Sequence, residues 1–377
     1  MAIQLMELKE PEAWPQDVDL IDLLDTIYSE LCRYIVFKDD NSALACTLWI
    51  LATWFVEELD FVPYMLITAP EKGCGKSQLL KLMSRLSRKP LNSSNLTQAT
   101  VYRFIDKCKP TLFIDEVDTF IGNNKELIGV LNCGNERDSS YVYRNEKSSK
   151  GELIPTAYDC FGFKALSGIN SKSLASALVS RSIVIELRKK LKDEKVEKLR
   201  SGPKPDFDEI CQKCVTIRNK YRGCFKSVLT NVRNSLLPSS LNDREKDKWE
   251  PLIALISLTG NRTALTMVQE CSIALSQLSC ESSKGTSIHL LEQLKELFNN
   301  NFKDHTKISS EALVNVLLSN EESEWQEANN GRRINQKWLA HKLGIYGIKS
   351  TQFKAGGVTK RGYIKDDFEE VFKRYLD

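Results

Sequence analysis

The stretch that most constrains this chain is residues 66–77, where an apolar strand enters a glycine-bearing loop that ends in Gly-Lys-Ser. A loop of this kind that opens a helix is typical of a phosphate-binding site, because backbone N–H groups and the helix N-terminus both face the anion. We expect Lys76 to reach the β- and γ-phosphates of a nucleotide and Ser77 to bind Mg²⁺. Pro70 replaces the first glycine of G-x-x-x-x-G-K-[ST], so a plain turn between strand and helix stays open as the alternative. The residues expected to contact the nucleotide are Glu71, Lys72, Gly73, Cys74, Gly75, Lys76, Ser77 and Gln78.

A second apolar run, residues 110–114, is followed directly by two acids, Asp115 and Glu116. Parallel strands that are covered on both faces are continuously apolar, and open α/β sheets bind ligands at the carboxyl ends of their strands. We therefore predict that Asp115 orients the Mg²⁺ shell and that Glu116 polarises the water that attacks the γ-phosphate. Two ordinary surface acids are the alternative, which the order of the two motifs disfavours. Together the motifs predict an ATPase with an α/β core, with ATP and Mg²⁺ as cofactors.

Length and composition favour a soluble cytoplasmic protein of more than one domain. The chain has 377 residues, which exceeds one typical domain. Residues 1–25 lack the basic head and apolar core of a secretory leader, and the apolar run at residues 43–56 is too short to cross a bilayer. Eleven cysteines without a repeated spacing favour reduced thiols over a disulfide framework. We expect no membrane contact.

Positive charge is concentrated near the C-terminus. The formal net charge is +3, yet residues 329–365 carry nine Lys and Arg and no Asp or Glu, which leaves −6 (3 − 9) for the rest. Residues 334–343 predict a short amphipathic helix, residues 350–353 the start of a second helix, and the following glycines a hairpin. This is the layout of a winged-helix DNA-binding module, with a solvated basic face or a protein contact as the alternative. The expected DNA contacts are Lys349, Lys354, Lys360 and Arg361.

Between these landmarks the chain divides into four parts. We expect a helical N-terminal segment over residues 1–60 packed on the core, an ATPase core over 61–190, a helical lid over 191–300 and the winged helix over 301–377. Within the core, residues 140–145 and 152–158 alternate like paired strands and predict a hairpin. The hairpin carries basic residues at and near its tip, namely Arg144, Lys147 and Lys150.

Four stretches together resemble a known family. They are Pro-Glu-Lys-Gly-Cys-Gly-Lys-Ser (70–77), Thr-Leu-Phe-Ile-Asp-Glu-Val-Asp (111–118), Ser-Arg-Ser-Ile-Val-Ile (180–185) and Asp-Arg-Glu-Lys-Asp-Lys-Trp-Glu-Pro-Leu (243–252). The resemblance spans nearly the whole chain and is to uncharacterised P-loop proteins of phages, plasmids and mobile elements, of the domain of unknown function 3631 type. It implies an AAA+ P-loop NTPase with a parallel sheet sandwiched by helices, similar in layout to self-loading replicative helicases, including the minichromosome maintenance type.

The resemblance also implies roles for three further residues. Arg181 matches the arginine finger, a cation that enters the site of a neighbouring subunit. Asn170 matches the polar sensor that positions the attacking water, and Arg244 matches a second sensor that touches the γ-phosphate. An ordinary surface arginine, a turn residue and a helix-surface ion pair are the respective alternatives. A finger requires a homo-oligomer, which in such families is most often a hexamer, and the hairpin tip would follow DNA in its channel.

The leading hypothesis is an ATP-driven translocase or helicase that acts on single-stranded or forked DNA of a mobile element, with a primase or other replication protein as a further partner. The first alternative is an AAA+ switch, that is a loader, initiator or transposition-type regulator that assembles on DNA without unwinding it. The second is a winged-helix DNA-binding regulator with a degenerate nucleotide site, which Pro70 motivates. Strand displacement distinguishes the first two, and ATP turnover excludes the third.

Overall fold

The computed structural model describes residues 8–376 except for 94–97, 118–124, 148–150, 169–175, 201, 203–204, 284–285, 304, 321–322, 330–331, 345 and 356–357. The chain forms two compact units, Met1–Ser283 and Lys284–Asp377, and each is described by itself. Within the described residues, no helix combines the length and the apolar character needed to span a membrane.

The first unit is built on a five-stranded parallel sheet with the strand order β2-β3-β6-β1-β7. Every residue of β1, β3 and β6 is buried, as expected of parallel strands that are covered on both faces. Because β6 lies between β1 and β3, the carboxyl ends of these three strands are neighbours. The predicted α/β core is therefore confirmed. The strands are β1 (Tyr64–Thr68), β2 (Pro90–Ser93), β3 (Thr111–Ile114), β6 (Lys164–Gly168) and β7 (Ser182–Glu186).

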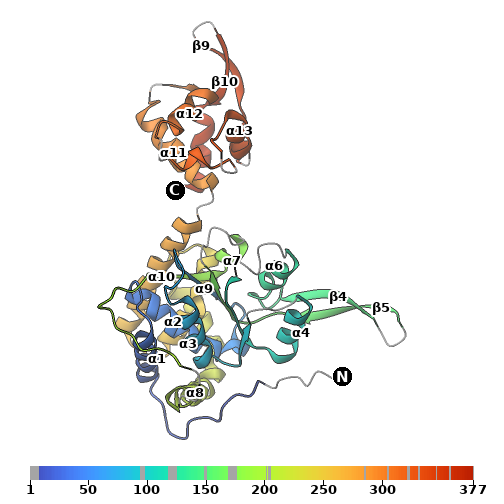
Figure 1. Cartoon of the computed structure of the whole chain (residues 1–377), viewed down its shortest axis with the longest axis vertical. Helices are drawn as coiled ribbons and strands as arrows, with labels where there is room; N and C mark the ends of the chain where they lie inside the picture. The colour runs from blue at the N-terminus through green and yellow to red at the C-terminus, as the bar shows by residue number, and fades with distance from the viewer. Residues whose placement is uncertain are drawn as a thin grey trace. The chain divides into compact units, whose positions relative to one another are not determined.

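Helices flank this sheet (Figure 1). Helix α3 packs against four of its strands, and α10 packs against β7 and against α2 and α9. The helices predicted before the glycine loop are present, and a short 3-10 turn, η1 (Val56–Glu58), follows them. The helices are α1 (Leu20–Tyr34), α2 (Asp40–Thr53), α3 (Lys76–Leu86), α4 (Gln98–Cys108), α6 (Lys125–Asn132), α7 (Ser176–Ser180), α8 (Pro205–Ser235), α9 (Asp243–Ser257) and α10 (Arg262–Ser283).

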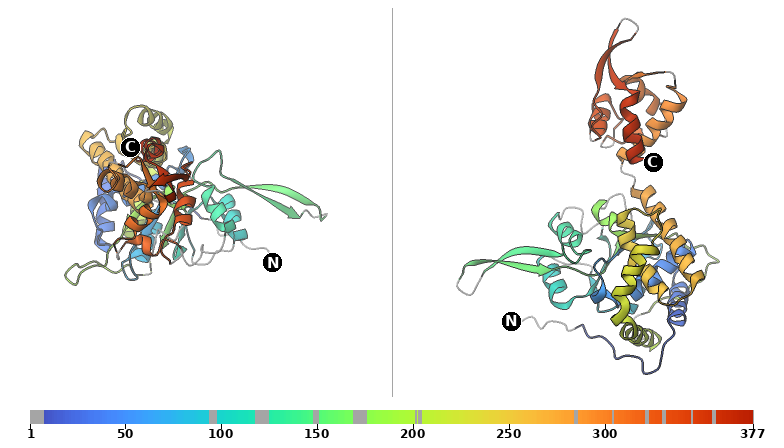
Figure 2. Two further views of the ribbon diagram at one scale, coloured as in Figure 1. Left: turned by 90° about the horizontal axis from the view of Figure 1, so that it is seen from above. Right: turned by 180° about the vertical axis from the view of Figure 1, so that it is seen from behind.

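A separate two-stranded ribbon projects from the body of this unit (Figures 1 and 2). Its strands, β4 (Tyr141–Lys147) and β5 (Leu153–Asp159), pair antiparallel from Tyr141 opposite Asp159 to Lys147 opposite Leu153. Helix α4 packs against β5. The predicted hairpin is confirmed, and we call it the β4–β5 ribbon.

The second unit has its own buried core and a three-stranded antiparallel sheet with the order β8-β10-β9. We expected the C-terminal part to begin at residue 301, but this unit begins at Lys284, because four apolar side chains of α11 are buried in its core: Leu290, Leu291, Leu294 and Phe298. Its elements are α11 (Thr286–Asn300), β8 (Lys307–Ser309), α12 (Ser310–Leu317), η3 (Glu324–Gln326), α13 (Gln336–Gly344), β9 (Thr351–Ala355), β10 (Val358–Ile364), η4 (Lys365–Phe368) and α14 (Glu369–Tyr375).

One local prediction in this unit is wrong. Residues 350–353, expected to start a second helix, lead into strand β9, which pairs along its length with β10 from Thr351 opposite Gly362 to Ala355 opposite Val358. Cross-strand pairing with a distant segment decides the structure of so short a stretch over its local pattern. The predicted helix at residues 334–343 is present as α13, and the predicted hairpin is present as β9 and β10.

Candidate functional site

The glycine loop, residues 69–75, connects β1 to α3 and depends on two glycines with a left-handed backbone. Gly73 has φ of 81° and Gly75 has φ of 89°, values that side-chain-bearing residues adopt only at a cost. Gly75 is the N-cap of α3 and offers no side chain to its first turn. The first N–H groups of α3 are therefore left for a ligand at the loop.

The loop borders a cleft of about 480 Å³, the glycine-loop cleft, which the acids after β3 also line. Lys76 Nζ donates a hydrogen bond to the carbonyl oxygen of Glu71 at 3.1 Å, so its ammonium group lies over the loop. The structure thus brings the two predicted motifs together from segments about 40 residues apart. The lining residues are Lys72, Gly73, Cys74, Gly75, Lys76, Ser77, Gln78, Asp115, Glu116, Ser167 and Gly168.

The two acids are held in a strained arrangement at the end of β3. Glu116 has φ of 52°, in the left-handed region that a residue with a side chain rarely adopts. Its N–H donates to Asp115 Oδ1 at 3.0 Å, and the hydroxyl of Ser167, near the end of β6, also donates to Asp115 Oδ1. Ser167 was not predicted, although a polar residue near the carboxyl end of an apolar strand is a signal that could have found it.

A second hollow of about 200 Å³, the side cleft, shares Gly73–Gly75 and Gln78 with the glycine-loop cleft. The other lining residues come from the end of α1 and from the segment after β7. Gln78 Nε2 donates to the carbonyl oxygens of Tyr34 at 2.6 Å and Glu197 at 3.2 Å. The predicted nucleotide contact Gln78 therefore ties α3 to both neighbouring segments.

Arg181 and Arg244 lie together in a third hollow of about 560 Å³, the arginine cleft. Arg181 donates through Nε to Asn135 Oδ1 and through Nη1 to the carbonyl oxygen of Ala177, both at 2.9 Å. Arg244 Nη1 donates to Ser180 Oγ at 3.4 Å. Among the described residues, this cleft and the glycine-loop cleft share no lining residue. Arg244 was expected as a second sensor beside the γ-phosphate, and the structure places it in the same cleft as Arg181.

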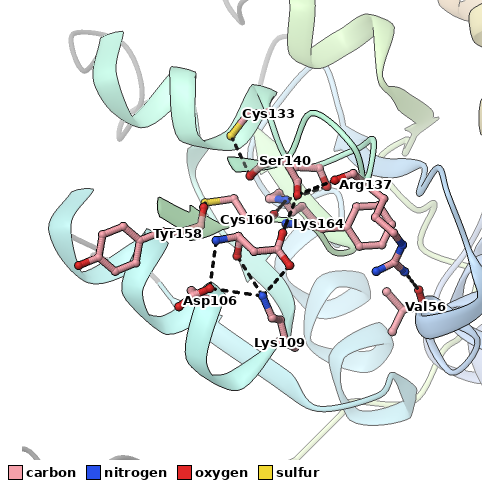
Figure 3. A network of polar contacts seen from close by, with 12 residues as sticks. Val56, Asp106, Lys109, Cys133, Arg137, Ser140, Tyr158, Cys160 and Lys164 are labelled. Carbon is pink, nitrogen blue, oxygen red and sulfur yellow. Dashed lines mark hydrogen bonds and ion pairs between the residues drawn. The ribbon is translucent and has the colours of Figure 1, made fainter. Parts of the chain in front are cut away.

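The base of the β4–β5 ribbon is fixed to the body by Asp159, the last residue of β5, whose partners Lys109 and Ser140 are labelled in Figure 3. Its carboxylate accepts hydrogen bonds from Lys109 Nζ at 2.7 Å, Ser140 Oγ at 2.6 Å and the Phe161 N–H at 2.9 Å. Partial burial alone would raise the pKa of Asp159, but these hydrogen bonds outweigh it and lower the pKa. Its backbone N–H also donates to Asp106 of α4 at 3.0 Å. The ribbon is thus anchored at the point where it meets the sheet.

A buried lysine lies beside this anchor (Figure 3). Lys164, the first residue of β6, is 1% exposed, and its Nζ donates to the carbonyl oxygens of Cys160 at 3.0 Å and Gly162 at 3.1 Å. Burial lowers the pKa of Lys164 to about 8. A Cβ on Gly134 would lie 2.1 Å from the carbonyl oxygen of Cys160 and 2.3 Å from Nζ, and because the first of these atoms belongs to the backbone, only glycine fits there. Lys164 was not among the predicted residues, although it stands alone as a charge at the start of an otherwise uncharged strand.

The structure separates the basic residues predicted on the ribbon. Arg144 is half-buried on the face toward α4. Its guanidinium carbon lies 5.5 Å from the centre of the Tyr102 ring, and its Nη1 donates a hydrogen bond to the Tyr143 carbonyl oxygen. Lys147 lies on the opposite face and is exposed. Lys150 lies outside the described residues, as does Asn170.

In the second unit, the four predicted DNA contacts, Lys349, Lys354, Lys360 and Arg361, are all exposed. Paired residues of antiparallel strands point to the same side. The register therefore puts Lys354 and Arg361 on one face of the β9–β10 hairpin and Lys360 on the other. Lys365 instead donates to the carbonyl oxygens of Phe298 at 3.2 Å and Lys303 at 3.3 Å, so it helps to hold the unit together.

Comparison with known proteins gives one family match and distant structural similarities. Residues 186–375, just over half of the chain, match the sequence profile of the family described as "Protein of unknown function (DUF3631)". A search of the curated proteins found no match. The chain is similar to a solved structure described as "SCCmec type IV Cch - active helicase", with TM-score 0.46 and 11% identity over 97% of this chain and 73% of that chain. It is also similar to the apo C-terminal region of NrS-1, with TM-score 0.35 and 13% identity over 95% of this chain and 77% of that chain.

Proposed function

The chain belongs to the DUF3631 family of proteins of unknown function, and from its own residues we propose that it is an AAA+ P-loop ATPase that translocates on DNA as a ring. The proposal rests on one juxtaposition. The glycine loop, with Lys76 and Ser77, shares a cleft with the strained acidic pair Asp115 and Glu116. A cradle of N–H groups, a lysine and a carboxylate pair are the parts that phosphoryl transfer to water needs.

The donor atoms in this cleft suit a magnesium nucleotide. The Ser77 hydroxyl and the Asp115 carboxylate are hard oxygen ligands of the kind Mg²⁺ prefers, and the ion, when bound, neutralises charge on the β- and γ-phosphates. Lys76 exchanges its hydrogen bond with the Glu71 carbonyl oxygen for phosphate oxygens. Glu116 orients the attacking water and takes up its proton. The side cleft, which continues from the glycine loop, offers space for the nucleoside.

The arginine cleft supports assembly into a ring. Arg181 and Arg244 line a hollow that, among the described residues, has no lining residue in common with the glycine-loop cleft. Two guanidinium groups are strong donors to phosphate oxygens. We therefore propose that both act on the nucleotide of a neighbouring copy, with the hexamer as the expected ring. Asn170 stays the proposed polar sensor.

DNA binding is assigned to the β4–β5 ribbon and to the second unit. The order α11, β8, α12, α13, β9, β10 has the layout of a winged helix, with α13 as the groove-binding helix and the β9–β10 hairpin as the wing. Its exposed cations Lys349, Lys354, Lys360 and Arg361 would contact backbone phosphates. Deletion of the whole second unit, residues 284–377, should then flatten the salt dependence of DNA binding.

The test combines ATP hydrolysis with strand displacement on a forked DNA labelled on one strand. We expect wild-type protein to hydrolyse ATP and release the labelled strand, and Lys76→Ala to do neither. Lys81→Ala, an exposed lysine on the same helix, serves as the matched control and keeps both activities. Hydrolysis without strand release would favour a loader or initiator that only assembles on DNA, and absence of hydrolysis would favour a regulator with a degenerate site.

A further inference from the structure

Large apolar side chains are exposed on the β4–β5 ribbon out of proportion to its size. Tyr143 is 68% exposed, Leu153 63%, Tyr141 50% and Ile154 49%, and only three other large apolar side chains among the described residues are comparably exposed. Water-exposed apolar surface of this kind marks a place where something binds. The ribbon therefore presents a binding surface and is more than a carrier of charge at its tip.

Strand pairing sorts these side chains by face. Tyr141 and Tyr143 point to the same side of β4, because alternate residues of a strand share a face, and their partners on β5 point there too. Every member of this side from 141 to 157 is exposed. We call it the open face, and it consists of Tyr141, Tyr143, Asn145, Lys147, Leu153, Pro155 and Ala157.

The other side of the ribbon is covered by α4. The rings of Tyr158 and Tyr102 lie 4.7 Å apart, and Glu146 forms an ion pair with Arg103 at 2.6 Å. Arg144 lies over the Tyr102 ring on this side. The cations and rings of the covered side thus already have partners within the chain, and the open face is the side left for a ligand.

Charge and shape on the open face fit a single strand of DNA. From Tyr143 to Ala157 its one charged member is Lys147. The only carboxylate on this side among the described residues is that of Asp159, which pairs with Tyr141 at the base of the ribbon and is engaged by Lys109 and Ser140. Tyr141 and Tyr143 are two residues apart on an extended strand, hence about 7 Å, so each ring is a separate platform. Aromatic rings bind bases of any sequence by stacking, while a nearby cation pairs with the phosphates.

We propose that the open face binds single-stranded DNA by stacking of bases on Tyr143 and Tyr141, with Lys147 on the backbone. This inference rests on the proposed function and specifies which residues of the ribbon hold the strand. Arg144 is no longer proposed as a DNA contact, because the guanidinium of Arg144 is engaged with Tyr102 on the covered side. The anchor at Asp159 fixes the base of the ribbon, so the open face is held ready for the strand.

The test measures binding of fluorescently labelled oligonucleotides by full-length protein with Mg²⁺ and a non-hydrolysable ATP analogue. One oligonucleotide is a thymidine strand, and the other has the same length but lacks bases at its centre. We expect wild-type protein to prefer the thymidine strand. Tyr143→Ala and Tyr141→Ala should each weaken its binding by roughly five- to a hundredfold and reduce the preference over the abasic strand, in keeping with loss of one stacking contact.

Two variants serve as controls. Tyr143→Phe keeps the ring and should bind like wild type, whereas Met267→Ala truncates a similarly exposed apolar side chain on α10 and should change nothing. A circular dichroism spectrum and a thermal unfolding midpoint like those of wild type show that Tyr143→Ala is folded.

Several outcomes would overturn the inference. One such outcome is that Tyr143→Ala binds the thymidine strand as tightly as wild type, or keeps the full preference over the abasic strand. Either result would show that bases do not stack on Tyr143. Sedimentation that shows loss of the oligomer in Tyr143→Ala would assign the open face to a neighbouring copy. In each case wild-type protein still binds DNA and the proposed function stands. Wild-type protein that binds neither strand would overturn both proposals.

Discussion

The glycine-loop cleft and the arginine cleft have similar volumes, about 480 and 560 Å³, but they are lined by different groups that could bind a nucleotide. The first has backbone N–H groups, two lysines (Lys72 and Lys76) and the two carboxylates that a metal and a water require. The lining of the second has two guanidinium groups beside the carboxylates of Glu136 and Asp247, and it does not include the glycine loop. An arginine stabilises phosphoryl transfer only where it reaches the developing charge. The difference therefore supports the proposal that each copy completes the site of another.

Arg181→Ala is expected to have the largest effect. Because the guanidinium would stabilise the transition state from outside the binding cleft, kcat for ATP hydrolysis should fall about a thousandfold or more, with ATP binding retained. Steady-state phosphate release and binding of a fluorescent ATP analogue measure the two quantities separately. Arg222→Ala, an exposed arginine on α8, is the matched control and should keep wild-type turnover.

Mixing variants breaks or sharpens the comparison directly. In a mixture of Arg181→Ala and Lys76→Ala, some interfaces combine an intact glycine loop from one copy with an intact arginine from the other. Activity should therefore reappear and peak at an intermediate ratio. If no ratio restores hydrolysis although the two variants assemble together, the two clefts do not form a shared site.

Glu116→Gln should be next in size. Loss of the carboxylate that takes up a proton from water should lower kcat by about a hundred- to ten-thousandfold, while ATP still binds because the glycine loop is intact. Glu186→Gln is a close control, because Glu186 also lies at the carboxyl end of a strand of the same sheet, β7. Glu186, however, is exposed and forms an ion pair with Lys38 at 2.6 Å. Equal loss of turnover in both variants would mean that Glu116 has no specific part in the chemistry.

Arg244→Ala should have a smaller effect, about ten- to a hundredfold in kcat, the size of one charged hydrogen bond. Its mixing behaviour is the sharper readout. Because Arg244 and Arg181 line the same cleft, Arg244→Ala should be rescued by Lys76→Ala but not by Arg181→Ala. Rescue between the two arginine variants would instead assign Arg244 to the nucleotide of its own chain and Arg181 to that of a neighbouring copy.

Local sequence patterns predicted the glycine-loop cleft almost completely. A buried parallel strand is continuously apolar, so the loop after β1 and the acids after β3 can be recognised where each strand ends. The left-handed backbone of Glu116 has no local signal in the sequence. Ser167 could be noticed as a polar residue near the end of an apolar strand, but its hydrogen bond to Asp115 depends on the pairing of β6 with β3.

The arginine cleft and the ribbon surface depend on contacts between distant segments. Arg181 and Arg244 meet because α9 packs where Ser180 ends α7, a contact across 64 residues that no local pattern records. On the ribbon, alternation was visible in the sequence, but only the packing of α4 decides that Tyr143 faces solvent and Arg144 does not. Strand β9 was mistaken for a helix start for the same reason, since its partner β10 determines it.

The smallest predicted effect concerns Lys164, which lies between the two clefts. Lys164 is the first residue of β6, and the last residues of β6 line the glycine-loop cleft. Its Nζ also lies 3.5 Å from the carbonyl oxygen of Gly134, and the next residue, Asn135, accepts a hydrogen bond from Arg181. Its pKa is about 8 in the folded protein against an ordinary value of 10.5. Between these values the unfolded chain binds a proton that the folded protein has released, so the free energy of unfolding rises with pH.

Urea unfolding of wild-type protein and Lys164→Met at about pH 7.5 and about pH 9.5 measures this contribution. The stability of wild type relative to the variant should increase by on the order of 1–2 kcal/mol over that interval. Lys81→Met, an exposed lysine on α3, should show no such change. A difference between wild type and Lys164→Met that stays constant with pH would mean that the buried amine keeps its proton, and that the carbonyl groups around it hold a cation between the two clefts.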